Sequence, residues 1–277
     1  MPSLAVLLAG IAAACWGASD FAGGVASKAL PAAKVVLWSQ LVGLVVAIAA
    51  APVFGGTVGV GDLGWGAAAG VVGAGGLLAL YRGLAVGRMS VVAPLSAVAG
   101  ALVPIGVGLG SGERPSVVAL AGVIVGIPAL WLVVGGGDRR GPGPSGVAEG
   151  VAAGLGFGLF FVLIAQTADD SGLWPLVAAR IGSLVVVATL ALLGGTVGPP
   201  RRRRGVVVAA GLGDMAANIA FLAAFRIGLL SLTTAVVSLY PAATVVLARV
   251  VLAERLHPRQ VAGVGLALGA LVLIAVG

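Results

Sequence analysis

One stretch near the end of the chain, Leu230–Pro258, is apolar for long enough to cross a lipid bilayer, and it closes with a Glu-Arg pair and a proline. A similar stretch, Met89–Pro115, lies 141 residues earlier (Glu113 against Glu254) and also contains prolines and a Glu-Arg pair. The same offset aligns further pairs without a gap: Gly87 with Gly228, Ser90 with Ser231, Arg114 with Arg255, and Trp16-Gly17 with Phe157-Gly158. One offset for all these pairs predicts an internal duplication, which constrains the architecture more than any isolated motif does.

Composition indicates whether the chain is surrounded by water or by lipid. Of its 277 residues 60% are hydrophobic and only 9% are charged, whereas soluble domains carry about 25% charged residues. The mean hydropathy of +1.18 implies more apolar surface than the chain can hide in its own interior, so we expect it to lie in a lipid bilayer. The net charge of +7 does not indicate nucleic-acid binding, because the basic residues stand between apolar runs rather than on one face.

The apolar runs predict an all-α membrane protein, because a segment in lipid must satisfy its own backbone hydrogen bonds. Glycines spaced by four residues, such as Gly66 and Gly70, predict close packing of these helices. We expect ten transmembrane helices, over residues 4–27, 33–53, 63–86, 89–110, 116–136, 147–168, 172–194, 206–227, 231–252 and 259–276.

The duplication divides these spans into two sets of five. Residues 1–136 form the first predicted repeat, 137–146 a Gly- and Pro-rich linker, and 147–277 the second repeat. Five is an odd number, so the second repeat enters the membrane from the opposite face. This predicts inverted topology, a construction of transporters whose site lies between the repeats near mid-membrane.

Three motifs carry a resemblance to a known family: Trp16-Gly17, Ala79-Leu80-Tyr81, and the Pro…Glu-Arg ends of spans four and nine. With them the chain resembles the drug/metabolite transporter superfamily, specifically its EamA-type branch, over essentially its whole length. The resemblance implies ten helices in two five-helix repeats and secondary transport of small metabolites, often export of amino acids or drugs. Arg82 departs from the small or polar residue that the family more often has there.

Charge indicates the orientation in the cytoplasmic membrane. Loops after the odd-numbered spans are basic, and the positive-inside rule places them in the cytoplasm, so that both termini would lie outside. Members of the family generally keep both termini inside, so the two arguments conflict. The basic residues in these loops are Lys28, Lys34, Arg88, Arg139, Arg140, Arg201–Arg204, Arg255 and Arg259.

Polar residues within the spans are candidate site residues, because an ionisable group in a membrane is costly to leave unpaired. Asp20, Gln40 and Asp214 share a depth of roughly 10–12 Å from the basic surface, by helical rise. Asn218 lies one turn beyond Asp214 on the same helix face. The two acids would either line a transport path, with the proton as coupling ion, or pair with Arg82 or Arg249 and fix the packing.

Arg180 is the remaining candidate charge inside a span. It would either bind a substrate carboxylate or pair with Asp169, Asp170 or a backbone carbonyl. Four aromatic residues are candidates for a cavity lining, and three prolines are candidate helix breaks that free a backbone carbonyl. The aromatic candidates are Trp16, Tyr81, Phe157 and Tyr240, and the prolines are Pro94, Pro104 and Pro241.

We therefore expect a small-molecule transporter that works as a monomer and is not an enzyme. No metal or cofactor is expected, since the lone histidine, His257, has no metal-ligand spacing and no Walker motif is present. A channel stays an alternative. A membrane-embedded lipid enzyme using Asp169-Asp170 is a weaker one, because a second Asp-rich motif is missing from the sequence.

Overall fold

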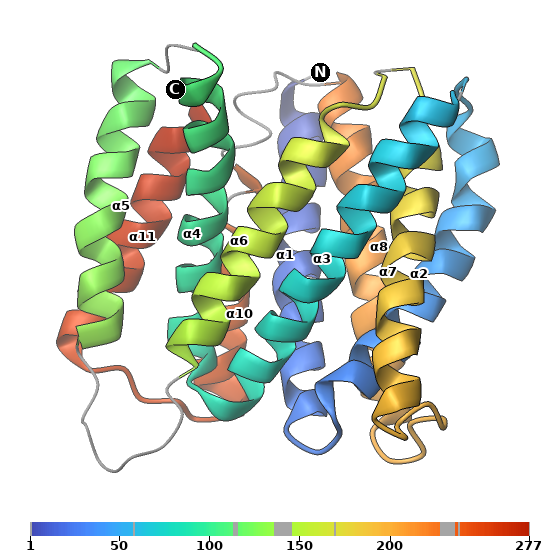
Figure 1. The fold of residues 1–277 in the computed structure, drawn as a ribbon. Coiled ribbons are helices and arrows are strands. Elements are labelled where there is room, and N and C mark those ends of the chain that lie inside the picture. Colours follow the sequence, from blue (N-terminus) through green and yellow to red (C-terminus); the bar gives the residue numbers. More distant parts are fainter. Residues whose placement is uncertain are drawn as a thin grey trace.

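The protein is described by a computed structural model covering residues 2–57, 59–112, 116–135, 146–168, 170–227, 236–237 and 239–276. These residues form a bundle of helices (Figure 1), and this described part of the chain contains no strand. The helices are α1 (Pro2–Ser27), α2 (Ala32–Phe54), α3 (Val60–Val86), α4 (Met89–Gly110), α5 (Val117–Gly135), α6 (Val147–Ile164), α7 (Trp174–Leu193), α8 (Arg204–Ile227), α10 (Tyr240–Val251) and α11 (Pro258–Val276).

The all-helical prediction is confirmed for these residues, and eight of the helices are long and apolar enough to cross a membrane. The apolar stretches Val117–Ala129 of α5 and Tyr240–Val251 of α10 are shorter. The remaining predicted spans match the helices to within a few residues. Both termini lie at one end of the bundle, opposite the turn between α1 and α2 (Figure 1). We call that opposite end, with Lys28 and Arg88, the basic end, and the end with the termini the acidic end.

The predicted span at 231–252 is described only in part. The helix described there, α10, begins only at Tyr240, and residues 228–235 and 238 lie outside the described residues. Pro241 lies in the first turn of α10, and the two described residues before the turn at Leu239, 236 and 237, are helical as well. Proline suits that position, where its fixed φ fits the helix and its missing N–H has no partner to lose. Pro94 and Pro104 lie inside α4, which runs through both of them as one helix from Met89 to Gly110.

Most helices pack against helices from the other half of the chain. Helix α1 packs along α8, α3 along α6 and α7, α4 along α6, and α5 along α11. Helix α2 contacts both α7 and α8, and α10 contacts α1 and α4. Helices α1, α2, α7, α8 and α10 are thereby brought together from both ends of the sequence, and they carry the polar residues singled out above.

Glycine makes the closest of these contacts possible. Cβ atoms added at Gly66 and Gly70 of α3 would overlap the backbone carbonyls of Pro175 and Ala179 on α7. Gly182 of α7 meets the backbone of Ala67 on α3 in the same way. The two helices thus touch backbone to backbone, as the four-residue glycine spacing predicted.

This contact yields a stability prediction. Gly70→Ala should destabilise the protein by roughly 1–3 kcal/mol, because the new methyl group meets backbone that cannot move aside. The matched control is Gly75→Ala in the same helix, where an added Cβ meets nothing within 4 Å. That variant should be neutral or slightly stabilising, since alanine favours helix over glycine. Thermal unfolding of the two purified variants in detergent compares them, and equal melting temperatures would contradict the close contact.

Candidate functional site

The centre of the candidate site is an arginine held by two polar partners from different helices. Arg180 of α7 donates one guanidinium N–H to the Asp214 carboxylate of α8 and another to the Gln40 side-chain oxygen of α2. The side chains of Arg180 and Asp214 are only 11% and 29% exposed. A hydrogen-bonded ion pair of this kind is what an arginine within an apolar bundle needs in order to stay charged.

The small size of Gly43 on α2 leaves room for this guanidinium. A Cβ atom added at Gly43 would lie 3.5 Å from both Cζ and Nε of Arg180, which is ordinary contact distance. Met215 adds a weak contact, with its sulfur 3.9 Å from Nη2 of Arg180. Asn218, one turn further along α8, donates its amide to the Asp214 backbone carbonyl at 2.7 Å. The Asn218 donor is therefore occupied within its own helix.

Asp20 of α1 lies close enough to Asp214 for their charges to repel. Unlike Asp214, its carboxylate makes no hydrogen bond or ion pair with any residue in the described ranges. The preceding residue, Ser19, is fixed by a 2.6 Å hydrogen bond from its hydroxyl to the Ala210 carbonyl of α8. The site thus combines one neutralised carboxylate with one that lacks a cation.

Trp16, one turn before Asp20 on α1, meets aromatic rings from two other helices. The Trp16 ring centroid is 5.8 Å from that of Phe221 on α8 and 6.4 Å from that of Tyr240 on α10. Thr244 fixes α10 to α1 through a 2.9 Å hydrogen bond from its hydroxyl to the Gly17 carbonyl. Phe221 was not predicted from the sequence, although it lies two turns after Asp214 and hence on the same face of α8.

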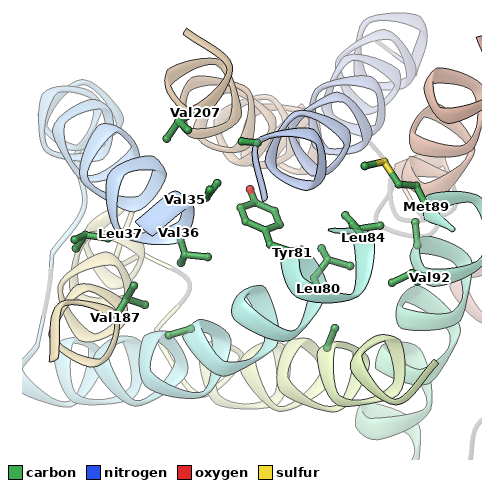
Figure 2. Close-up of a cluster of buried hydrophobic side chains, with 14 of the residues drawn as sticks. Val35, Val36, Leu37, Leu80, Tyr81, Leu84, Met89, Val92, Val187 and Val207 are labelled. Carbon is green, nitrogen blue, oxygen red and sulfur yellow. The ribbon is translucent and has the colours of Figure 1, made fainter. Parts of the chain in front are cut away.

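Tyr81 belongs to the inner wall of the site rather than to a membrane interface. It is 2% exposed, and its hydroxyl hydrogen-bonds to Ser19. Figure 2 shows its ring pointing from α3 into the middle of the bundle, beside Val35. Gly23 of α1 provides the space, because an added Cβ there would overlap the ring.

Phe157 lies apart from this group. Its ring packs against Gly76, where an added Cβ would come within 3.1 Å of it, in the contact between α3 and α6. The structure therefore brings together eight of the nine predicted polar and aromatic candidates and leaves Phe157 in a helix contact. The eight are Trp16, Asp20, Gln40, Tyr81, Arg180, Asp214, Asn218 and Tyr240.

Three of the alternative ion-pair partners suggested by the sequence, Arg82, Arg249 and Asp170, are wrong. Arg82 lies 3.4 Å from Glu149 at the basic end, with its side chain 73% exposed, and Arg249 is exposed on α10. Asp170 accepts a 2.7 Å hydrogen bond from the Thr57 hydroxyl at the acidic end, so it does not pair with Arg180. Asp169 lies outside the described residues. Helical rise gives the depth of a residue but not the direction in which its side chain points, which is why these pairings were mistaken.

Comparisons with known proteins support a family of membrane transporters. The fold resembles a solved crystal structure, with a TM-score of 0.66 and 18% identity over 99% of this chain and 98% of the other. No curated protein matches the sequence. Residues 144–276, just under half of the chain, match the model of the EamA-like transporter family. This match confirms the resemblance seen in the sequence, and the eight long apolar helices agree with a multi-pass membrane protein.

Proposed function

We propose that this protein is a secondary transporter of the cytoplasmic membrane that exports small cationic or zwitterionic metabolites, such as amino acids or drug-like amines, in exchange for protons. The observation that carries the proposal is the arrangement of two carboxylates around one guanidinium. Asp214 is neutralised by Arg180, whereas Asp20 has no cationic partner in the described part of the chain. A carboxylate in that position can hold either a proton or a substrate cation.

The charge balance supports a cationic group on the substrate. With Asp20 ionised the group of Asp20, Asp214 and Arg180 carries one net negative charge, and with Asp20 protonated it carries none. Trp16 lies one turn before Asp20 on α1 and packs against the Tyr240 ring, and aromatic faces attract ammonium groups. The same carboxylate would then bind the substrate in one half of the cycle and a proton in the other.

Alternating access supplies the mechanism. We propose that the duplication forms two inverted five-helix repeats, 1–136 and 147–277, joined by the linker 137–146. Helices α1 and α2 carry Asp20 and Gln40, and α7 and α8 carry Arg180 and Asp214, so the site would draw on both repeats. Movement of one repeat against the other would expose this site to each side of the membrane in turn. Because one chain contains both repeats, a monomer would suffice.

A two-step experiment tests the proposal. Purified protein is screened by thermal shift against amino acids, amines and nucleosides, since a ligand that binds the folded state raises its melting temperature. We expect amines or amino acids to stabilise the protein. Binding of anionic compounds alone would contradict the charge argument.

The stabilising compound is then tested in liposomes. A transporter should show uptake that saturates, that is accelerated by unlabelled substrate on the opposite side of the membrane, and that is driven by an imposed pH gradient. Flux that neither saturates nor shows counterflow would instead indicate a channel. The lipid-enzyme alternative has less support, because Asp170 is occupied by Thr57.

A further inference from the structure

Helix α4 begins without a cap of its own. Its N-cap residue is Arg88, which makes no side-chain capping bond, and arginine cannot accept one from backbone N–H groups. The next two residues, Met89 and Ser90, are fully buried. Free N–H groups at a buried helix N-terminus are costly, so this helix needs an acceptor from elsewhere.

Glu254, in the loop between α10 and α11, provides that acceptor from the other half of the chain. Its carboxylate accepts hydrogen bonds from the backbone N–H groups of Met89 at 3.0 Å and Ser90 at 3.1 Å. It also accepts a 2.6 Å hydrogen bond from the Ser90 hydroxyl. A carboxylate at a helix N-terminus is stabilised further by the helix dipole.

A second contact lies beside the first. The Arg88 guanidinium donates to the Gln260 side-chain oxygen at 3.0 Å, and the same oxygen accepts the His257 backbone N–H at 3.1 Å. Gln260 is 2% exposed and lies at the start of α11. The turn before α4 is thus fastened to the loop before α11 at the basic end of the bundle.

We propose that Glu254 is the latch that keeps the basic end of this protein closed. Any effect of this latch on flux rests on the transport function proposed above. The Met89 and Ser90 N–H groups must bond either to this carboxylate or to water. While the basic end is closed and dry, only Glu254 can satisfy them. When the two halves separate there, water takes its place. Removing the carboxylate therefore destabilises the closed arrangement selectively and shifts the population towards a basic-end-open one.

The experiment measures opening directly, without transport. Spin labels are attached to cysteines at Val86 and Arg259, two exposed positions on opposite sides of the latch, in a Cys15→Ala background. Pulsed electron–electron double resonance measures the distribution of distances between the two labels in the reconstituted protein. Glu254→Gln should add or enlarge a population at longer distance by several-fold. A second pair at Val60 and Val276 reports on the acidic end, and we expect no lengthening there.

The matched control is Glu149→Gln. It removes the same charge at the same end of the bundle. Glu149 lies in the first turn of α6, but its partner is the exposed Arg82, and the N-cap of α6, Gly146, makes no side-chain cap hydrogen bond. Its distance distribution should equal that of the parent protein. Ser90→Ala, which deletes only the hydroxyl hydrogen bond, should give a smaller shift than Glu254→Gln, and adding it to Glu254→Gln should have no further effect.

Unchanged distances in both Glu254→Gln and Ser90→Ala would overturn the latch and leave Glu254 as a packing contact. This outcome differs from failure of the proposed function, in which the parent protein shows no coupled flux in liposomes whatever the distances are. If flux is present and Glu254→Gln also slows it while lengthening the Val86–Arg259 distance, the latch acts in the transport cycle. Ser90→Ala serves as the test if Glu254→Gln does not fold.

Discussion

Replacing Asp20 with asparagine is expected to reduce pH-driven transport to the level of empty liposomes while the protein stays folded. Asparagine keeps the shape of the side chain but cannot release a proton. Because no cation neutralises Asp20 in the described part of the chain, its loss leaves no partner charge unpaired, and stability should change little. Proton-gradient-driven uptake of the ligand identified by thermal shift measures the effect, with the melting temperature of the variant recorded alongside.

Two comparisons make this result specific. Glu149→Gln removes an acid whose arginine partner is 73% exposed, and it should transport like the parent protein. Exchange of pre-loaded substrate without a pH gradient should survive in Asp20→Asn better than net transport does. If Asp20→Asn accumulates normally and transports with an unchanged pH profile, Asp20 has a structural role and the coupling proposal is wrong.

Replacing Arg180 with glutamine is expected to damage both the fold and transport. The change leaves the Asp214 carboxylate in the bundle without its cation, which for a buried pair costs about 3–5 kcal/mol. We expect a cost at the lower end of that range, because the Asp214 side chain is 29% exposed and its charge is partly solvated. Unfolding of the purified variant in detergent, followed by heat or denaturant, measures the loss.

The double variant Arg180→Gln with Asp214→Asn separates charge from shape. It removes the unpaired carboxylate and should recover most of the lost stability, whereas transport should stay impaired because the polar site is altered. Arg82→Gln should cost less stability than Arg180→Gln, because the Arg82 side chain is 73% exposed whereas that of Arg180 is 11% exposed. Equal stability of Arg180→Gln and Arg82→Gln would show that the pair with Asp214 contributes nothing.

The candidate site was predicted in part from depth alone. Counting residues from the basic end placed Asp20, Gln40 and Asp214 at one level, and the structure brings Gln40 and Asp214 onto a single guanidinium. Depth follows from helical rise, which is a local property. The partner of Asp214 was missed, since Arg180 begins nearer the acidic end and its long side chain reaches across to α2 and α8.

The cap on α4 is a second contact that the local sequence cannot predict. The repeat aligns the Glu-Arg pairs at Glu113 and Glu254 but does not show what either carboxylate binds. Glu254 acts on residues 164 and 165 positions away, and no local pattern gives the distance between such segments.

The sequence by itself determined the helices, their membrane setting and the family. These follow from the length and apolarity of each run, because every segment in lipid must satisfy its own backbone. Only the tertiary structure decided which residues meet: Arg180 with Asp214 and Gln40, Trp16 with Phe221 and Tyr240, and Glu254 with Ser90. The rotation of each helix about its axis is set by close packing, as at Gly70 on Ala179, between residues far apart in the chain.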